Sequence, residues 1–238
     1  MDFPRLPSAA EFLGKACVLT AFGAFTTVKA MTIKYQLASW EQSQSPGNYI
    51  ELAAQIAALV FLVLLLTLTL LRFRPTQTAE GWEPRASALI GTFLAFSLVA
   101  LPMANIGPVL RVVAIALILV GWLLSIYVLA WLGRSFSITP QARRLVTRGP
   151  YAVVRHPLYV CEEIAIIGVV LLCLSPLAIL IAGVQWMFQL RRMTNEDRVL
   201  RASFPEYPDY AALTPKIIPL LHFRAAKKIA SNRFQTTA

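Results

Sequence analysis

The residues that could carry chemistry are concentrated between positions 133 and 220 of this 238-residue chain. The segment Arg155–Tyr159 (RHPLY) combines a fixed cation, a titratable ring and an aromatic hydroxyl. Pro157 suits the first position of a helix, because its φ is preset and it has no amide donor to lose. The free amides that follow, together with the planar guanidinium of Arg155, predict a site for a small anionic group.

Acidic residues follow this segment in two pairs. Glu162 and Glu163 come three and four residues after Tyr159, on the first turn of the same predicted helix. A carboxylate at membrane depth is costly and usually faces a cavity or a partner, so either could accept a proton. Glu196 and Asp197 form the second pair, at the far end of the next apolar stretch.

Other polar residues near the second pair have simpler interpretations when they are taken singly. Arg192 precedes Glu196 by four residues, the spacing of a surface ion pair on a helix. Tyr207 and Tyr210 would be anchors at a membrane interface. The isolated cysteines form no metal-ligand motif, and no metal site is expected.

The helices that must position these groups are unusually apolar. Hydrophobic residues make up 57% of the chain and charged residues only 14%, against roughly a quarter charged in an ordinary soluble domain. This composition excludes a disordered chain, and a soluble core of this length could not bury so much apolar surface. The sequence therefore predicts an integral membrane protein.

A helix needs about 20 mostly apolar residues to cross the hydrocarbon core of a membrane. The stretches expected to cross it are 12–33, 49–71, 87–104, 108–132 and 158–190. Ser175-Pro176 divides the last stretch, and because proline continues a helix poorly, we expect a helical hairpin there. The predicted fold is all-α: a polytopic membrane bundle of about six helices, the last two a hairpin, with a cytosolic loop before it and a C-terminal helix after it.

The distribution of basic residues predicts the orientation of this bundle. With six helices and both termini in the cytoplasm, 19 of the 22 Lys and Arg residues lie on the cytoplasmic side, and only Lys29, Lys34 and Arg111 lie outside. The net charge of +10 is then explained by the membrane topology and by electrostatic attraction to anionic membrane lipids. A nucleic-acid partner is not expected, because no separate basic face with interleaved aromatics is present.

Three regions follow from these patterns. Residues 1–132 are expected to be N-terminal transmembrane helices, 133–220 a catalytic region that includes the hairpin, and 221–238 a basic C-terminal tail.

The combined motifs resemble the isoprenylcysteine carboxyl methyltransferase family, whose wider relatives include the phospholipid N-methyltransferases. The motifs that carry the resemblance are LGRSFS (132–137), GPYAVVRHPLYV (149–160), the apolar hairpin, NEDRVL (195–200), FPEYPDY (204–210) and TPKIIP (214–219). The resemblance covers about residues 133–220, and the first four helices match only in being hydrophobic. It implies an integral membrane methyltransferase that uses S-adenosyl-L-methionine and a lipophilic acceptor.

The resemblance also implies a set of site residues. It makes the loop a cofactor-binding loop and assigns to the cofactor Arg155, His156, Pro157 and Tyr159, with Glu196 and Asp197. Two positions depart from the family pattern: Cys161 stands where the family has Gly, and Asp197 replaces the second Glu of a Glu-Glu pair. Glu162 and Glu163 are not part of the general pattern.

A hypothesis for the roles follows from the chemistry of the methyl donor. Arg155 and the helix-start amides would hold its carboxylate, and Glu196 its ammonium or ribose hydroxyls. The rings of Tyr159 and Tyr151 would favour its sulfonium or adenine. Our catalytic candidates are Arg155, Glu196 and Glu163.

The identity of the acceptor stays open on the sequence alone. A carboxylate acceptor needs no general base, whereas for an amine or thiol the proton could go to Glu162, Glu163 or His156. Prenylcysteine, phospholipid amine and small apolar compounds such as thiols all fit. Functions of another class are a transporter, although the acids cluster at one end of the membrane region, and a non-catalytic membrane scaffold.

Overall fold

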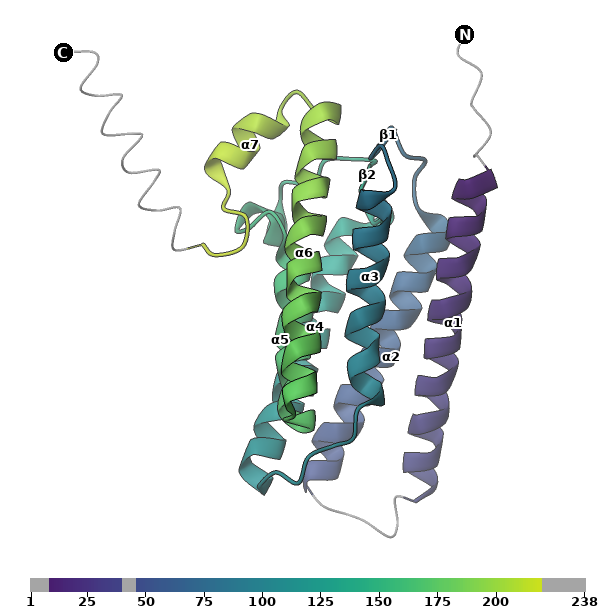
Figure 1. The fold of residues 1–238 in the computed structure, drawn as a ribbon, viewed down its shortest axis with the longest axis vertical. Coiled ribbons are helices and arrows are strands. Elements are labelled where there is room, and N and C mark those ends of the chain that lie inside the picture. The colour runs from purple at the N-terminus through teal and green to yellow at the C-terminus, as the bar shows by residue number, and fades with distance from the viewer. Residues whose placement is uncertain (1–8, 40–45, 220–238) are drawn as a thin grey trace, which may run out of the picture.

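The computed structural model describes residues 9–39 and 46–219, and this part of the chain is mostly helical. Six long helices run alternately up and down along the long axis of the molecule (Figure 1). They are α1 (Ala9–Ala38), α2 (Pro46–Leu71), α3 (Glu83–Ser97), α4 (Pro108–Leu132), α5 (Pro157–Cys173) and α6 (Pro176–Ser203), followed by the short α7 (Tyr207–Leu213). Short 3-10 turns are η2 (Leu98–Ala100), η3 (Gly133–Ser135) and η4 (Gly149–Ala152).

Proline marks where several of these helices begin. Pro46, Pro108, Pro157 and Pro176 are each the first residue of a long helix, the position where a missing amide hydrogen costs least. Ser175 adds a side-chain cap, since its Oγ accepts a hydrogen bond from the Ala178 amide at 3.1 Å. The helix break expected at Ser175-Pro176 is therefore confirmed, and α5 and α6 form a hairpin.

The two arms of this hairpin pack against different partners. Helix α5 lies along α4, which in turn packs on α2, whereas α6 lies along α3, and direct contact between α5 and α6 is sparse. Figure 1 shows α3 and α6 in front of α4 and α5. The two arms of the hairpin therefore belong to different layers of the bundle.

The expectation of an all-helical fold is confirmed apart from one small feature. A two-residue antiparallel pair joins β1 (Gln77–Thr78) to β2 (Gln141–Ala142). The Phe73 amide also donates to the Arg134 carbonyl at 2.9 Å. These bonds tie the connection between α2 and α3 to the loop that follows α4, and so restrict that loop beside the site.

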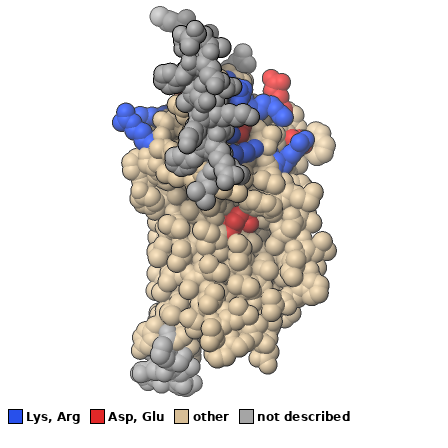
Figure 2. All heavy atoms as spheres, turned by 90° about the vertical axis from the view of Figure 1, so that its left-hand side faces the viewer, with Lys and Arg blue, Asp and Glu red and all other residues tan. Residues whose placement is uncertain are grey.

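Two segments, Gly47–Leu71 and Pro108–Ser135, are long and apolar enough to cross a membrane, with mean hydropathy of 2.6 and 2.8. The remaining four crossings, and the cytoplasmic orientation, stay predictions. On the face drawn in Figure 2, Lys and Arg gather at one end, and the surface below them is almost free of charge. The predicted basic tail, 221–238, lies outside the described residues.

Helices α4 and α5 approach closely through small residues. A Cβ added at Gly168 would lie 2.5 Å from the Ala114 carbonyl oxygen, and one at Gly121 would lie 2.5 Å from the Ala165 amide nitrogen. Both obstructing atoms belong to helix backbone, so relief requires the helices to separate. This contact holds α5, and with it the start of the candidate site, against α4.

We predict that Gly168→Ala destabilises the protein, because overpacking of this kind costs about 1–3 kcal/mol and outweighs the gain in helix propensity. Thermal unfolding in detergent should show a midpoint several degrees lower. Gly183→Ala in α6 is the matched control, since an added Cβ there meets no atom of the described residues within 4 Å. Equal midpoints for the two variants would contradict the close-packing interpretation.

Candidate active site

The end of the loop before α5, Arg155-His156, is held by contacts of its backbone and of its side chains. His156 is the residue that precedes α5, and its side chain makes no cap hydrogen bond with that helix, so the ring is free to reach α6. The Arg155 amide donates to the Pro215 carbonyl at 2.8 Å, and the His156 amide to the Lys216 carbonyl at 3.3 Å. The segment after α7 therefore pairs with the backbone of the Arg155-His156 dipeptide.

Asp197 of α6 binds the side chains of the same dipeptide. Its Oδ2 lies 3.2 Å from Arg155 Nη1 and 3.6 Å from Lys216 Nζ. Its Oδ1 lies 2.9 Å from His156 Nε2 and also accepts a hydrogen bond from the Tyr207 hydroxyl. One carboxylate thus joins the loop, α6, α7 and the closing segment.

Glu196, the neighbour of Asp197, points elsewhere. Its carboxylate accepts a hydrogen bond from the Tyr159 hydroxyl of α5, and its Oε2 lies 3.8 Å from His156 Nδ1. It lines the main cavity, whereas Asp197 does not. The two adjacent acids therefore have different roles. Asp197 fixes the loop, and Glu196 faces the space where a ligand can bind.

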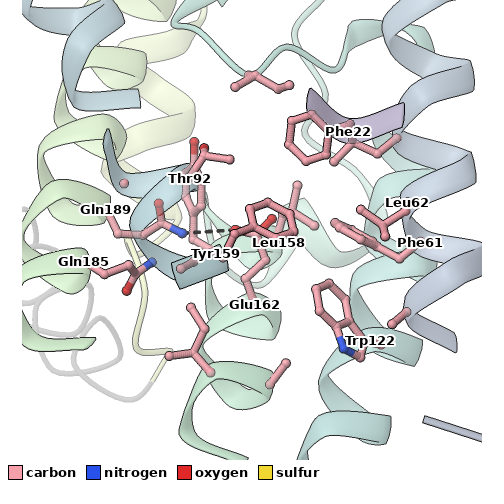
Figure 3. Close-up of a pocket in the computed structure, with 18 of the residues that line it drawn as sticks. Phe22, Phe61, Leu62, Thr92, Trp122, Leu158, Tyr159, Glu162, Gln185 and Gln189 are labelled. Atoms are coloured by element: carbon pink, nitrogen blue, oxygen red, sulfur yellow. Dashed lines mark hydrogen bonds between the residues drawn. The ribbon is translucent and has the colours of Figure 1, made fainter. Parts of the chain in front are cut away.

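That cavity has a volume of about 690 Å³, within the range of small-molecule sites. One end is polar and is lined by Tyr151, Arg155, His156, Tyr159 and Glu196. From there it continues between the helices into an apolar region, shown in part in Figure 3, whose lining includes Phe22, Phe61, Leu62 and Trp122. A single space is thus bounded by charged groups at one end and by aromatic rings further in.

Most of the residues expected at the site come together around this space. The five at its polar end are all among the predicted set, and Tyr151 and Tyr159 are both buried. Three predicted residues do not line the cavity: Pro157, which begins α5, Asp197, which acts through the loop, and Glu163. Glu162 lines it instead of Glu163.

Two interpretations made from single residues are wrong. Arg192 is not part of a surface ion pair: it is buried, its Cζ lies 5.0 Å from the centre of the Tyr159 ring, and its Nη2 donates to the Ile138 carbonyl at 3.2 Å. Tyr207 is not an interfacial anchor, because it is only 1% exposed and its hydroxyl is bound to Asp197.

Sequence reasoning predicted Glu196 but missed the three other polar residues that α6 presents to the cavity. Gln185, Gln189, Arg192 and Glu196 all line it, and their spacing of four, three and four residues places them on one helix face. A polar stripe on an otherwise apolar helix was the signal that could have identified them.

The charges around Asp197 make stability depend on pH. Burial alone would raise the pKa of Asp197, but the hydrogen bond and charge of His156, the hydrogen bond from Tyr207 and the charge of Arg155 lower this pKa to about 2. An unfolded Asp has a pKa of about 3.9. Because the folded value is the lower one, the contribution is fully present above the unfolded pKa and is lost as pH falls toward 2.

We therefore predict that wild-type protein in detergent loses about 2 kcal/mol more stability between pH 5 and pH 2 than Asp197→Asn does. Thermal unfolding at several pH values measures the difference. Asp209→Asn, which removes an exposed acid on α7, should retain the wild-type dependence. The same pH dependence in wild type and Asp197→Asn would refute this role of Asp197.

Comparisons with known proteins place part of the chain in sequence relation to methyltransferases. Residues 109–206 match the model of the phospholipid methyltransferase family. The Arabidopsis thaliana protein-S-isoprenylcysteine O-methyltransferase B is 33% identical over 115 residues, which is 45% of this chain and 58% of that protein.

Two bacterial proteins share shorter regions with the chain. The nickel-cobalt-cadmium resistance protein NccN of Alcaligenes xylosoxydans xylosoxydans is 39% identical over 82 residues (34% of this chain, 38% of that protein). The cobalt-zinc-cadmium resistance protein CzcN of Cupriavidus metallidurans is 42% identical over 79 residues (32% and 36%). The chain thus spans less than two thirds of each relative. The family resemblance read from the sequence is nevertheless confirmed over part of the chain: residues 109–206 match the phospholipid methyltransferase family, and an isoprenylcysteine O-methyltransferase is among the similar proteins.

Proposed function

We propose that the protein is an integral membrane methyltransferase that uses S-adenosyl-L-methionine to methylate a lipophilic acceptor. The observation that carries this proposal is the continuous cavity, with Arg155, His156 and Glu196 at one end and an apolar, aromatic interior beyond them. A polar methyl donor and an apolar acceptor can then meet in one space. In this proposal the basic end of the bundle, with the site and both termini, faces the cytoplasm.

The residues at the polar end fit this donor. Arg155 Nε and Arg192 Nε are buried donors that have no hydrogen-bond partner within the described part of the chain. Both side chains line the cavity, so a ligand carboxylate there would satisfy groups that are otherwise costly to bury. The Glu196 carboxylate suits an ammonium or ribose hydroxyls, and the faces of Tyr159 and Tyr151 suit an adenine or a sulfonium.

The protein's share of the reaction is then mainly to position the reactants. When bound, the donor supplies a methyl group on a positively charged sulfur, which needs no further activation. Asp197 holds Arg155 and His156 in place, and the Tyr159 hydroxyl fixes the Glu196 carboxylate. Such positioning in an enclosed site can supply a large part of the rate enhancement.

The lipophilic nature of the acceptor follows from the interior of the cavity. Phe61 and Trp122 lie with ring centres 4.7 Å apart beside Leu62 on its wall (Figure 3). Apolar walls favour a ligand with a hydrocarbon body. Prenylcysteine, phospholipid and small apolar acceptors all satisfy this requirement.

We predict that Arg155→Ala and Glu196→Gln each weaken binding of S-adenosyl-L-methionine at least tenfold, because each removes a charge-assisted hydrogen bond of about 1.5–3 kcal/mol. Isothermal titration calorimetry on detergent-purified protein gives the affinity, and circular dichroism checks folding. Arg191→Ala is the control and should change affinity less than twofold, since Arg191 is 60% exposed and pairs with Glu83 away from the site.

Unchanged donor affinity in both folded site variants would overturn the site assignment. Incubation of wild-type protein with methyl-labelled donor and a membrane lipid extract then tests turnover. A labelled product is the expected result. Donor binding without any labelled product would instead favour the non-catalytic scaffold, and substrate counterflow in vesicles without methylation would favour a transporter.

A further inference from the structure

Glu162 is a carboxylate on the wall of the cavity that the proposed function does not use. It lies on the second turn of α5, three residues after Tyr159, and it lines the cavity. Its neighbour Glu163 does not line the cavity, and Glu163 Oε1 is buried with no hydrogen-bond partner among the described residues. The two adjacent acids therefore have different environments.

A chain of hydrogen bonds fixes the Glu162 carboxylate. Gln189 Nε2 donates to Glu162 Oε2 at 3.0 Å, and Arg192 Nη1 donates to Gln189 Oε1 at 2.9 Å. Gln189 is 1% exposed and Arg192 6%. Since Arg192 has only donors, the amide oxygen of Gln189 must face it, and the amide NH₂ must then face Glu162. Figure 3 shows the bond between Gln189 and Glu162.

The same network leaves part of Glu162 available to a ligand. Only Oε2 accepts a hydrogen bond within the described residues, and Oε1 does not. Across the cavity in Figure 3 lie the rings of Phe61 and Trp122. A carboxylate among aromatic faces attracts a cation or a proton donor. It repels a second carboxylate, because two like charges in low-dielectric surroundings destabilise each other.

Resting on the proposed function, we propose that Glu162 accepts the proton of the methyl acceptor, and that the acceptor atom is therefore a proton-bearing nitrogen or sulfur rather than a carboxylate oxygen. Gln189 and Arg192 are positioning residues that act through Glu162.

The step balances in atoms and electrons. The lone pair of the acceptor atom forms the new bond to the methyl carbon, and the electron pair of the broken carbon–sulfur bond stays on the sulfur that leaves. The proton of the acceptor atom moves to Glu162 Oε1, which becomes a neutral carboxylic acid and later returns the proton to water. No oxidant or metal is required.

Three probes of equal chain length test this inference: octylamine, octanethiol and octanoate. With wild-type protein and methyl-labelled S-adenosyl-L-methionine, we expect octylamine or octanethiol, but not octanoate, to be methylated. Glu162→Gln should lower kcat for that acceptor at least a hundredfold, while donor affinity by calorimetry changes less than twofold. Glu80→Gln, a control that changes an exposed acid outside the cavity, should retain at least half of kcat.

Equilibrium binding without the methyl donor gives a readout separate from turnover. Radiolabelled octylamine should bind Glu162→Gln at least tenfold more weakly than wild type, and octanoate no more weakly. Gln189→Leu should reduce kcat, and the double variant with Glu162→Gln should lose no more than Glu162→Gln alone, since positioning acts only through the carboxylate.

The outcomes separate this inference from the proposed function. Wild-type protein that methylates octanoate, or Glu162→Gln with unchanged kcat, would overturn the role of Glu162 and leave the methyltransferase standing. If none of the probes is methylated, the equilibrium binding of octylamine decides whether the inference stands. Equal octylamine affinity in wild type and Glu162→Gln would then reject it. Failure of wild-type protein to bind the donor removes the proposed function itself.

Discussion

The geometry of the candidate site depends on a single partly buried carboxylate. Asp197 meets the cations of Arg155 and Lys216, the ring of His156 and the hydroxyl of Tyr207. An acid with this many partners is strongly favoured in its charged form. Because its partners come from the loop before α5, from α7 and from the segment after it, one side chain sets the position of three separate pieces of chain relative to α6.

The cavity lies between helices α5 and α6, which are joined by a turn but make few direct contacts with each other. Close backbone contact at Gly121 and Gly168 holds α5 to α4, while α6 packs on α3. The two arms therefore diverge into different layers, and the space between them is lined by the polar face of α6. Gln189 and Arg192 cross part of this space to reach Glu162 and the Ile138 carbonyl. Part of a costly set of buried polar groups is satisfied in this way, whereas Arg192 Nε has no partner within the described residues.

Much of the helical framework could be predicted from local signals. The predicted stretch 108–132 coincides with α4, and Ser175-Pro176 marks the start of α6, because proline and apolar run length act within a few residues of chain. The start of α5 at Pro157 has the same cause. The pairing of β1 with β2 was not foreseen, since a two-residue strand carries no periodic pattern.

By itself, the sequence determined the helical and strongly apolar character of the chain, the order of its helices, the motif at the start of α5 and the family resemblance, because each of these depends on composition or on short spacings. Only the tertiary structure decided which of two adjacent acids faces the cavity: Glu196 rather than Asp197, and Glu162 rather than Glu163. Neighbouring residues on a helix differ by about 100° in direction, so their roles depend on where the packing partners of that helix lie. Those partners, α3, α4 and the segment after α7, are distant in the chain, and their contacts exist only in the folded bundle.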